Sequence, residues 1–270
     1  MQLRPGNAHT ADGGLEFILP LLDQVEEKLC QVASVRIDAG FPEENLMAAL
    51  GKRRTPYVAR IKNNGALDRL AQPYLTRPVG RPPAEPRYWT VEMSYQAKDW
   101  SRERRVVLVI QEKPDELLLH YFWLLTSWTV DEKDADTLLE TYRRRGTAEG
   151  HLGELMSVLQ PALSSSPRPK THYRGKTPKK RQASANSFYI NEVLLLLNAL
   201  AYNVAHTARV LMEVATQEGW SLKRLRERVL RVAGRLLLHG RRATLVLSPN
   251  SAKLWTVLLS QLRRLRYAGT

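Results

Sequence analysis

The chain has 270 residues, and 43% of them are hydrophobic, which is enough to bury a core in one elaborate domain or two small ones. Its 41 Lys and Arg residues exceed its 27 Asp and Glu residues and give a net charge of +14, which favours a polyanionic partner, first nucleic acid and second an anionic membrane surface. The single cysteine, Cys30, excludes an internal disulfide framework and a multi-cysteine zinc site, and it fits a reducing cytosol.

The chain shows no pattern of secretion or membrane insertion. Its first residues, MQLRPGNAHTADGG, lack the charged-then-apolar pattern of a secretory signal. The most apolar stretch, residues 193–211, is interrupted by four polar residues, Asn198, Asn203, His206 and Arg209. We therefore expect a cytoplasmic, nucleoid-associated protein with no membrane partner.

The first 62 residues predict a helix followed by a strand–helix–strand unit. Apolar residues recur at helical spacing over residues 15–29, with Asp12 as a candidate N-cap. Residues 32–38 predict a short strand, residues 42–50 a helix and residues 55–62 a second strand. Strands joined by a short helix in this way should be parallel and buried. Asp38 would then lie at the carboxyl end of a parallel strand, where open α/β sheets place their sites.

The middle of the chain changes from proline-rich to β-rich. Residues 63–86 contain five prolines and predict a linker or extended edge. Beyond them, residues 87–97, 104–111 and 117–128 are rich in β-branched and aromatic side chains and are separated by turn-like segments. We expect three antiparallel strands there, as a β-rich insertion over residues 63–133.

The last half of the chain predicts helices around a basic loop. A helix in one or two pieces should run from Asp134 to Leu159 and carry the segment 134–160. Residues 161–186 predict a loop, in which residues 164–182 hold seven Lys or Arg and no acid. The helical C-terminal region, residues 187–270, should begin with a long apolar helix to residue 215.

Three further elements are expected within that C-terminal region. An amphipathic helix over residues 220–242 has Ser221 as its candidate N-cap. Residues 243–249 predict a short strand, and residues 252–267 predict a closing helix.

Three polar side chains in residues 140–160 are spaced for one helix face. Tyr142, Arg145 and Glu149 have offsets of zero, three and seven, which place them within roughly a 60° arc at 100° per residue. A carboxylate can hold a divalent metal ion while Arg and Tyr donate hydrogen bonds to phosphate, so this set suits phosphodiester chemistry. The alternative is an ordinary surface ion pair between Arg145 and Glu149, with Tyr142 at the edge of the core.

These residues resemble a known signature. The spacing Y-x2-R-x3-E is similar to that of insertion-sequence DDE transposases of the YREK type, and the surrounding YRRRGTAEGHLGEL resembles one branch of that group. Four further segments resemble the same branch in chain order: LRPGNAHTADGG, VRIDAGF, YQAKDWSRERRVV and SFYINEVLLLLNALAYN. Several separate motifs in the right order are far more specific than one short motif.

The resemblance implies an α/β, RNase H-like catalytic domain in which three carboxylates bind two Mg²⁺ ions. It makes Asp38, in RIDAG, the second acid and Glu149 the third, so that both are metal ligands and catalytic residues. It also implies that Tyr142 and Arg145 grip DNA phosphate. The partners it implies are insertion-sequence ends, target DNA and a further copy of the chain or a full-length transposase.

Two departures from the family pattern bear on activity. The lysine expected seven residues after the third acid is Met156 here. The family carries its first Asp on the first strand of the core, upstream of the segment that resembles LRPGN, and Asp12, Asp23 and Asp68 stand in cap, helix and loop contexts instead. We therefore expect the RNase H-like core to lack its first strands, an exposed sheet edge beside the Asp38 strand, and impaired metal binding.

Other candidate DNA contacts lie outside this constellation. Trp100 stands between two predicted strands among cations that include Arg104 and Arg105, where it either stacks on an unpaired base or closes a small hairpin core. The basic loop offers phosphate contacts through counterion release, from Lys170, Arg174, Lys176, Lys179, Lys180 and Arg181.

The function expected from these features is that of an N-terminally truncated DNA transposase, inactive by itself. The first alternative is a noncatalytic DNA-binding fragment that interferes with the full-length transposase. The second is a chain that works only with an N-terminal part supplied by another open reading frame.

Overall fold

The computed structural model describes residues 2–4, 8–9, 11–81, 83–161, 163 and 187–268. The chain forms two compact units. The N-terminal unit is Pro5–Ala148, and the C-terminal unit is Glu149–Thr270 together with Met1–Arg4. The expected basic loop over residues 164–182 lies outside the described residues.

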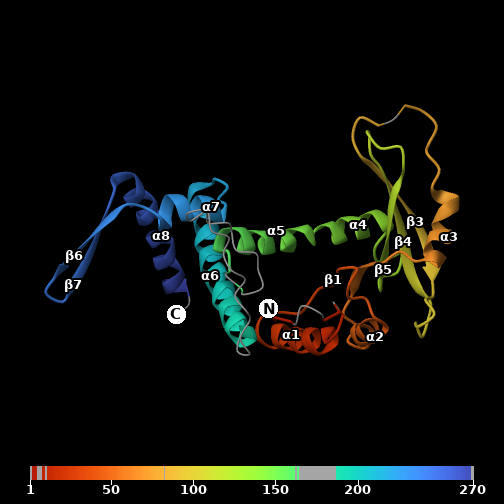
Figure 1. The fold of residues 1–270 in the computed structure, drawn as a ribbon, viewed down its shortest axis with the longest axis horizontal. Coiled ribbons are helices and arrows are strands. Elements are labelled where there is room, and N and C mark those ends of the chain that lie inside the picture. Colours follow the sequence, from red (N-terminus) through yellow and green to blue (C-terminus); the bar gives the residue numbers. More distant parts are fainter. Residues whose placement is uncertain are drawn as a thin grey trace, which may run out of the picture. The chain divides into compact units, whose positions relative to one another are not determined.

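A five-stranded mixed sheet organises the N-terminal unit (Figure 1), which agrees with the expected α/β class. Its strands lie in the order β1-β2-β5-β4-β3. They are β1 (Val35–Ile37), β2 (Tyr57–Ile61), β3 (Arg87–Tyr95), β4 (Arg104–Glu112) and β5 (His120–Thr126). The β1 strand stands at the end of this order, so among the described residues it is an edge strand, as expected.

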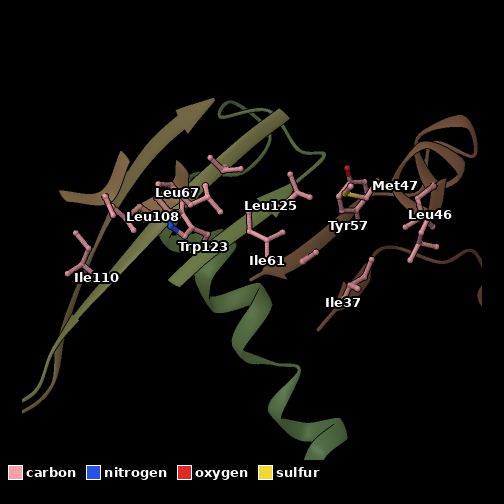
Figure 2. Close-up of a cluster of buried hydrophobic side chains, with 14 of the residues drawn as sticks. Ile37, Leu46, Met47, Tyr57, Ile61, Leu67, Leu108, Ile110, Trp123 and Leu125 are labelled. Atoms are coloured by element: carbon pink, nitrogen blue, oxygen red, sulfur yellow. The ribbon is translucent and has the colours of Figure 1, made fainter. Parts of the chain in front are cut away.

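The predicted strand–helix–strand unit is confirmed. Strands β1 and β2 pair in parallel, with Ile37 opposite Ala59, and α2 (Glu44–Lys52) connects them. One side of α2 is apolar and buried, through Leu46, Met47 and Leu50. Figure 2 shows Met47 and Leu46 of α2 beside Tyr57 of β2. Burial of this helix face fixes the crossover and leaves Asp38 directly after β1.

The three expected antiparallel strands are also confirmed, and they continue the same sheet. Strand β4 pairs with β3 and β5, and β5 pairs with β2, with Leu125 opposite Ala59. Strand β4 is therefore central, and it is buried on both faces. The β-rich segment thus extends the sheet of β1 and β2.

Helices cover both faces of this sheet. On one face, α1 (Gly14–Lys28), α2 and α3 (Gly65–Ala71) pack against alternating strand residues, among them Leu108 and Trp123 (Figure 2). On the other face, α4 (Ala135–Arg143) packs against Val58, Val107 and Leu124. Because side chains alternate along a strand, a central strand with apolar residues at successive positions supplies both cores.

The structure corrects two local predictions in this unit. Residues 63–86 are not wholly a linker, since α3 begins after Asn64, whose side chain accepts hydrogen bonds from the backbone N–H groups of Ala66 and Leu67. Asp12 is not the N-cap of α1, because that position is Gly13 and the Asp12 carboxylate instead accepts a hydrogen bond from the His9 N–H. Asn is a preferred N-cap residue, but the five prolines of residues 63–86 favoured the prediction of a linker.

The C-terminal unit contains helices and a hairpin. The helix α5 (Gly146–Glu154) enters it and continues as a π-helix, Leu155–Leu159. The long helix α6 (Ser187–Thr216) packs with α7 (Leu222–Leu225) and α8 (Pro249–Ala268) around a core of eight buried residues, Leu155, Tyr202, Met212, Trp220, Leu222, Leu225, Val229 and Leu258. The expected long helix and closing helix are thereby confirmed, and Ser221 caps α7 as predicted.

The predicted amphipathic helix over residues 220–242 is wrong beyond Leu230. Helix α7 passes into a short π-helix that ends at Leu230, and the chain then forms an antiparallel hairpin of β6 (Gly234–His239) and β7 (Arg242–Leu247). The strand expected in residues 243–249 is confirmed as β7. Gly234 and Gly240 interrupt the helical pattern, and Gly240 takes a positive φ of 57° at the turn.

By length and composition, α6 is the one helix in the described part of the chain that is apolar enough to cross a membrane. Only 17% of its most apolar window is buried. Its polar residues include Asn198, and it contributes Tyr202 and Met212 to the core of the C-terminal unit. One helix of this kind does not indicate a membrane protein.

Candidate active site

Asp38 occupies the position that parallel sheets use for their sites. It directly follows β1, and one carboxylate oxygen, Oδ1, accepts a hydrogen bond from the N–H of Ala39 at 2.8 Å. Its side chain is 47% exposed. The turn that follows is closed by a hydrogen bond from the Phe41 N–H to the Asp38 carbonyl. The strand end therefore presents one oriented carboxylate.

Arg145 brings the YREK-like segment to this carboxylate. Its guanidinium lies 3.0 Å from Oδ2 of Asp38, and its side chain is 23% exposed. The two residues are far apart in sequence, one after β1 and one in the turn between α4 and α5. The ion pair thus joins the second predicted acid to the predicted phosphate-binding arginine, although sequence spacing did not indicate this contact.

The helix that was expected to carry Tyr142, Arg145 and Glu149 on one face is interrupted. Helix α4 ends at Arg143 and α5 begins at Gly146, so Arg145 lies in the turn between them. The single-face arrangement is therefore wrong. Gly146 has a low helix propensity, which is consistent with a break at this point.

Tyr142 belongs mainly to the core. Its side chain is 9% exposed, and its ring lies 6.5 Å from that of Phe122 between α4 and the sheet. This packing fixes the C-terminal end of α4, three residues before Arg145. A role for Tyr142 in gripping DNA phosphate stays a prediction.

Glu149 and Met156 lie in the C-terminal unit. Glu149 is exposed in α5, and Met156, which stands where the family has lysine, is 44% exposed in the following π-helix. Because Glu149 and Asp38 belong to different units, their joint role as metal ligands stays a prediction.

A pocket of about 240 Å³ lies at the turn that follows Asp38, and Asp38 itself does not line it. It is lined by the residues after β1 and β2 and by an aromatic pair, notably Ala39, Gly40, Lys62, Asn64, Tyr95 and Trp100. The rings of Tyr95 and Trp100 meet edge to face at 5.5 Å. Trp100 is half-buried against the core and also lines the pocket, whereas its stacking on an unpaired base stays a prediction.

Arg104 and Arg105 are held inside the fold by protein partners. Arg104 is 6% exposed, and it donates hydrogen bonds to both carboxylate oxygens of Glu44 and to the Tyr57 hydroxyl. Arg105 pairs with Glu92 and donates to three backbone carbonyls, those of Trp128, Thr129 and Lys133. These contacts stabilise the sheet, so a DNA contact from either residue stays a prediction.

The partnership of Glu44 with Arg104 was missed from the sequence. Burial raises the pKa of Glu44, but hydrogen bonds from Ser101 and Arg104 and the charge of Arg104 outweigh it, so the pKa lies below its ordinary value of 4.5. A helix-to-strand ion pair of this kind leaves no local sequence signal, because β2, α3 and β3 separate its partners along the chain.

The remaining cationic residues predicted to contact DNA lie outside the described part of the chain. They are Lys170, Arg174, Lys176, Lys179, Lys180 and Arg181.

The donor chemistry at Asp38 suits a hard divalent cation, but the number of donors is small. Carboxylate oxygens are the ligands that Mg²⁺ prefers. Within the described residues, no group of three or more His, Cys, Asp and Glu side chains gathers at one place. Asp38 and Glu149 therefore fit the type of ligand required, and further oxygen ligands have to complete a site.

Comparison with known protein families identifies the chain. Residues 1–168 match the model of the family described as transposase DDE domain group 1, and no curated protein matched. The matched segment exceeds half of the chain and includes Asp38, Arg145 and Glu149. The chain therefore belongs to the DDE transposases of the RNase H-like superfamily.

Proposed function

We propose that the chain derives from a transposase that cleaves and joins DNA at insertion-sequence ends with divalent metal ions, that Asp38 and Glu149 are two of the three carboxylates, and that the chain is inactive by itself. Transposases of this family generally use divalent metal ions. The observation that carries the proposal is the 3.0 Å contact between Arg145 and Asp38. It links a carboxylate at the end of a parallel strand to the arginine of the family signature, beside an open pocket.

Asp38 and Glu149 would hold Mg²⁺, which when bound supplies an activated water or 3′ hydroxyl and stabilises the leaving oxygen. Arg145 neutralises Asp38 in the absence of the cation. With Asp38 holding a cation, the Arg145 guanidinium would be available to donate hydrogen bonds to a DNA phosphate. Tyr142, packed in the core, positions Arg145 by fixing the end of α4.

Other residues of the chain would hold the DNA. Trp100, in the pocket wall, offers an aromatic face for an unpaired base. The cations of residues 164–182 would bind backbone phosphates, and this contribution should weaken as salt concentration rises.

Paramagnetic mapping tests the metal-binding part of this proposal without requiring activity. We expect added Mn²⁺ to broaden the amide NMR signals next to Asp38 and Glu149 first. In Asp38→Asn the effect at Ala39 and Gly40 should disappear, whereas Asp115→Asn, which removes an exposed turn acid, should leave it intact. Equal broadening at residues 39–40 in all three proteins would overturn the assignment of Asp38.

A second candidate function follows from the number of carboxylates. The described residues hold no cluster of three acids, yet the chain carries a net charge of +14. A polypeptide that binds DNA without cleaving it would occupy insertion-sequence ends and interfere with a full-length transposase. Added in excess to a transposition reaction of that enzyme, residues 1–270 should lower the yield, and Glu149→Gln should lower it equally.

A further inference from the structure

The β6–β7 hairpin is an exposed two-stranded ribbon of the C-terminal unit. Eleven of its twelve strand residues are exposed, and its strands pair from Gly234 opposite Leu247 to His239 opposite Arg242. The two-residue turn is Gly240–Arg241, and the positive φ of Gly240 fits a type II′ turn. This turn type matches the twist of the strands, so the hairpin is a defined element.

The register sorts the hairpin side chains onto two different faces. Directly opposed residues share a face, and successive residues alternate. One face is therefore wholly apolar apart from a glycine, and it holds Gly234, Leu236, Leu238, Ala243, Leu245 and Leu247. The other, the basic face, holds Arg235, Leu237, His239, Arg242, Thr244 and Val246. Arg241 adds a further cation at the tip.

The cations of the hairpin are not used inside the protein. Among the described residues, the side chains of Arg235, Arg241 and Arg242 form no hydrogen bond or ion pair, in contrast to those of Arg104 and Arg105, which are held by Glu44 and Glu92. Acidic residues of the same region do not balance these positive charges, because residues 187–270 contain thirteen Lys and Arg but four Glu and no Asp. An exposed, uncompensated basic face suits a polyanion.

We propose that the basic face of the β6–β7 hairpin binds duplex DNA, with Arg235, Arg241 and Arg242 on backbone phosphates. This inference rests on the proposed function, and it assigns the DNA contact to an element outside the carboxylate site. A two-stranded β-ribbon is one of the two elements that the major groove admits.

The spacing of the arginines supports this geometry. Arg235 and the pair His239–Arg242 are four strand positions apart, which is about 13 Å at 3.3 Å per residue. The major groove is about 12 Å wide, so cations at the two ends of the face can reach phosphates on both sides of the groove. Leu237 and Thr244 lie between them, and Val246 lies opposite Arg235. These side chains would face the groove floor, where apolar groups and hydroxyls contact base edges.

The competing partner for this hairpin is protein, and it would use the apolar face. Leu236, Leu238 and Leu245 are each more than half exposed, and a second copy of the chain could cover them. The charge argues for DNA first, because two copies of so basic a region repel each other unless phosphates lie between them. Substitutions on the basic face and on the apolar face can therefore distinguish DNA from protein as the partner.

The test compares two triple variants of the full chain that remove equal charge from the same unit. One is Arg235→Ala, Arg241→Ala and Arg242→Ala on the hairpin. Its control is Lys253→Ala, Arg263→Ala and Arg264→Ala on exposed positions of α8. Binding to a duplex of random sequence is measured by fluorescence anisotropy between 50 and 200 mM salt. Over this range, a protein with 6–10 phosphate contacts loses roughly three to five orders of magnitude in affinity.

We expect the hairpin variant to bind at least tenfold more weakly than the control at low salt. Its plot of log affinity against log salt concentration has a negative slope. This slope should become less steep by about 0.9 for each phosphate that is no longer neutralised, or by nearly three units in all. The variant with Lys at the same three positions should recover most of the slope, because the charge returns, and this recovery also shows that the hairpin remains folded.

Three results distinguish failure of this inference from failure of the proposed function. If the unaltered chain does not bind duplex DNA, the proposed function fails with it. If the chain binds DNA but the two triple variants are weakened equally, only net charge matters and the hairpin assignment is overturned. If the hairpin variant binds DNA normally and Leu238→Asp dissociates an oligomer, the hairpin is a protein-binding arm, and the assignment is overturned in favour of a second copy.

Discussion

At the carboxyl end of β1, Arg145 pairs with the carboxylate that we propose as a metal ligand. Arg145 lies 3.0 Å from Asp38 Oδ2, so the proposal implies that a cation at this oxygen would compete with it. We predict that Arg145→Ala raises the affinity of the Asp38 site for Mn²⁺ several-fold, because it removes both a competitor and a repelling positive charge. The same change should weaken DNA binding. The Mn²⁺ concentration that half-broadens the Ala39 and Gly40 amide signals measures the first effect.

Arg144→Ala is the matched control for this prediction. Arg144 is exposed in the same turn and carries the same charge, but it forms no hydrogen bond through its side chain and no ion pair among the described residues. Its removal should leave the Mn²⁺ response near that of the unaltered chain. An equal gain in both variants would mean that general charge, and not the ion pair, controls the site.

The Glu44–Arg104 pair is a stability determinant of the N-terminal unit. Glu44→Ala leaves the guanidinium of Arg104, whose side chain is 4% exposed, without its carboxylate. We predict a loss of about 3 kcal/mol in the free energy of unfolding, at the low end for broken buried pairs because Glu44 is itself partly exposed. Urea denaturation measures it. The neighbouring Glu43→Ala removes an exposed carboxylate and should change the free energy by less than about 0.5 kcal/mol.

The same pair predicts a pH dependence of stability. The pKa of Glu44 is lowered in the folded chain, so its contribution to stability is fully present above the ordinary value of 4.5 and is lost as pH falls through the folded pKa. The stability difference between the unaltered chain and Glu44→Gln should therefore be constant above pH 4.5 and should narrow below it. A difference that widens on acidification would contradict this assignment.

How well individual residues were predicted depended on whether their signal was local. Asp38 was placed correctly because a strand end and a following turn are visible in seven consecutive residues. Its partner Arg145 was not, since the contact arises only when α4 packs on the sheet. The pairing of Arg104 with Glu44 was not predicted, because clustered cations look alike in sequence whether an acid of the same fold holds them or they face solvent.

Among the elements, α3 shows how one polar side chain defines a helix inside a proline-rich segment. Asn64 accepts hydrogen bonds from two backbone N–H groups, each at 3.0 Å, and the helix then buries Leu67 and Ala71. We predict that Asn64→Ala lowers the free energy of unfolding by about 1 kcal/mol, whereas Asn64→Asp, which keeps an accepting oxygen, changes it little. Thermal unfolding of both variants provides the measurement, and equal losses would point to a role outside the cap.

Helices and strands were predicted correctly where the spacing of hydrophobic residues was clear. Strands β3 to β5 and the long helix α6 have extended patterns and were predicted correctly. Residues 220–242 failed because three consecutive leucines, Leu236 to Leu238, fit a helix face and a strand equally well, and Arg residues favour helices. The pair of glycines at 234 and 240 was the signal that favoured a hairpin.

At the scale of the whole molecule, charge and carboxylates are divided between two units. Asp38 belongs to the N-terminal unit and Glu149 begins the C-terminal unit, which also carries the basic hairpin. The motif that contains Arg145 and Glu149 spans both units. It identifies the family, but it does not predict where the acids lie in space. The family could therefore be inferred from the sequence, whereas the contact of Asp38 with Arg145 within the N-terminal unit could not.

Catalysis by the polypeptide of residues 1–270 would require both DNA binding and a complete set of carboxylates. We predict that it binds DNA in a salt-dependent manner but does not nick or join it in Mg²⁺, because two carboxylates supply too few anionic oxygens to hold two hard cations. Glu149→Gln should bind DNA as the unaltered polypeptide does. Incubation with supercoiled plasmid that carries the insertion-sequence ends, followed by electrophoresis, is the measurement. Mg²⁺-dependent nicking that vanishes in Glu149→Gln would refute the prediction, since it would require a complete set of ligands in which Glu149 is already catalytic.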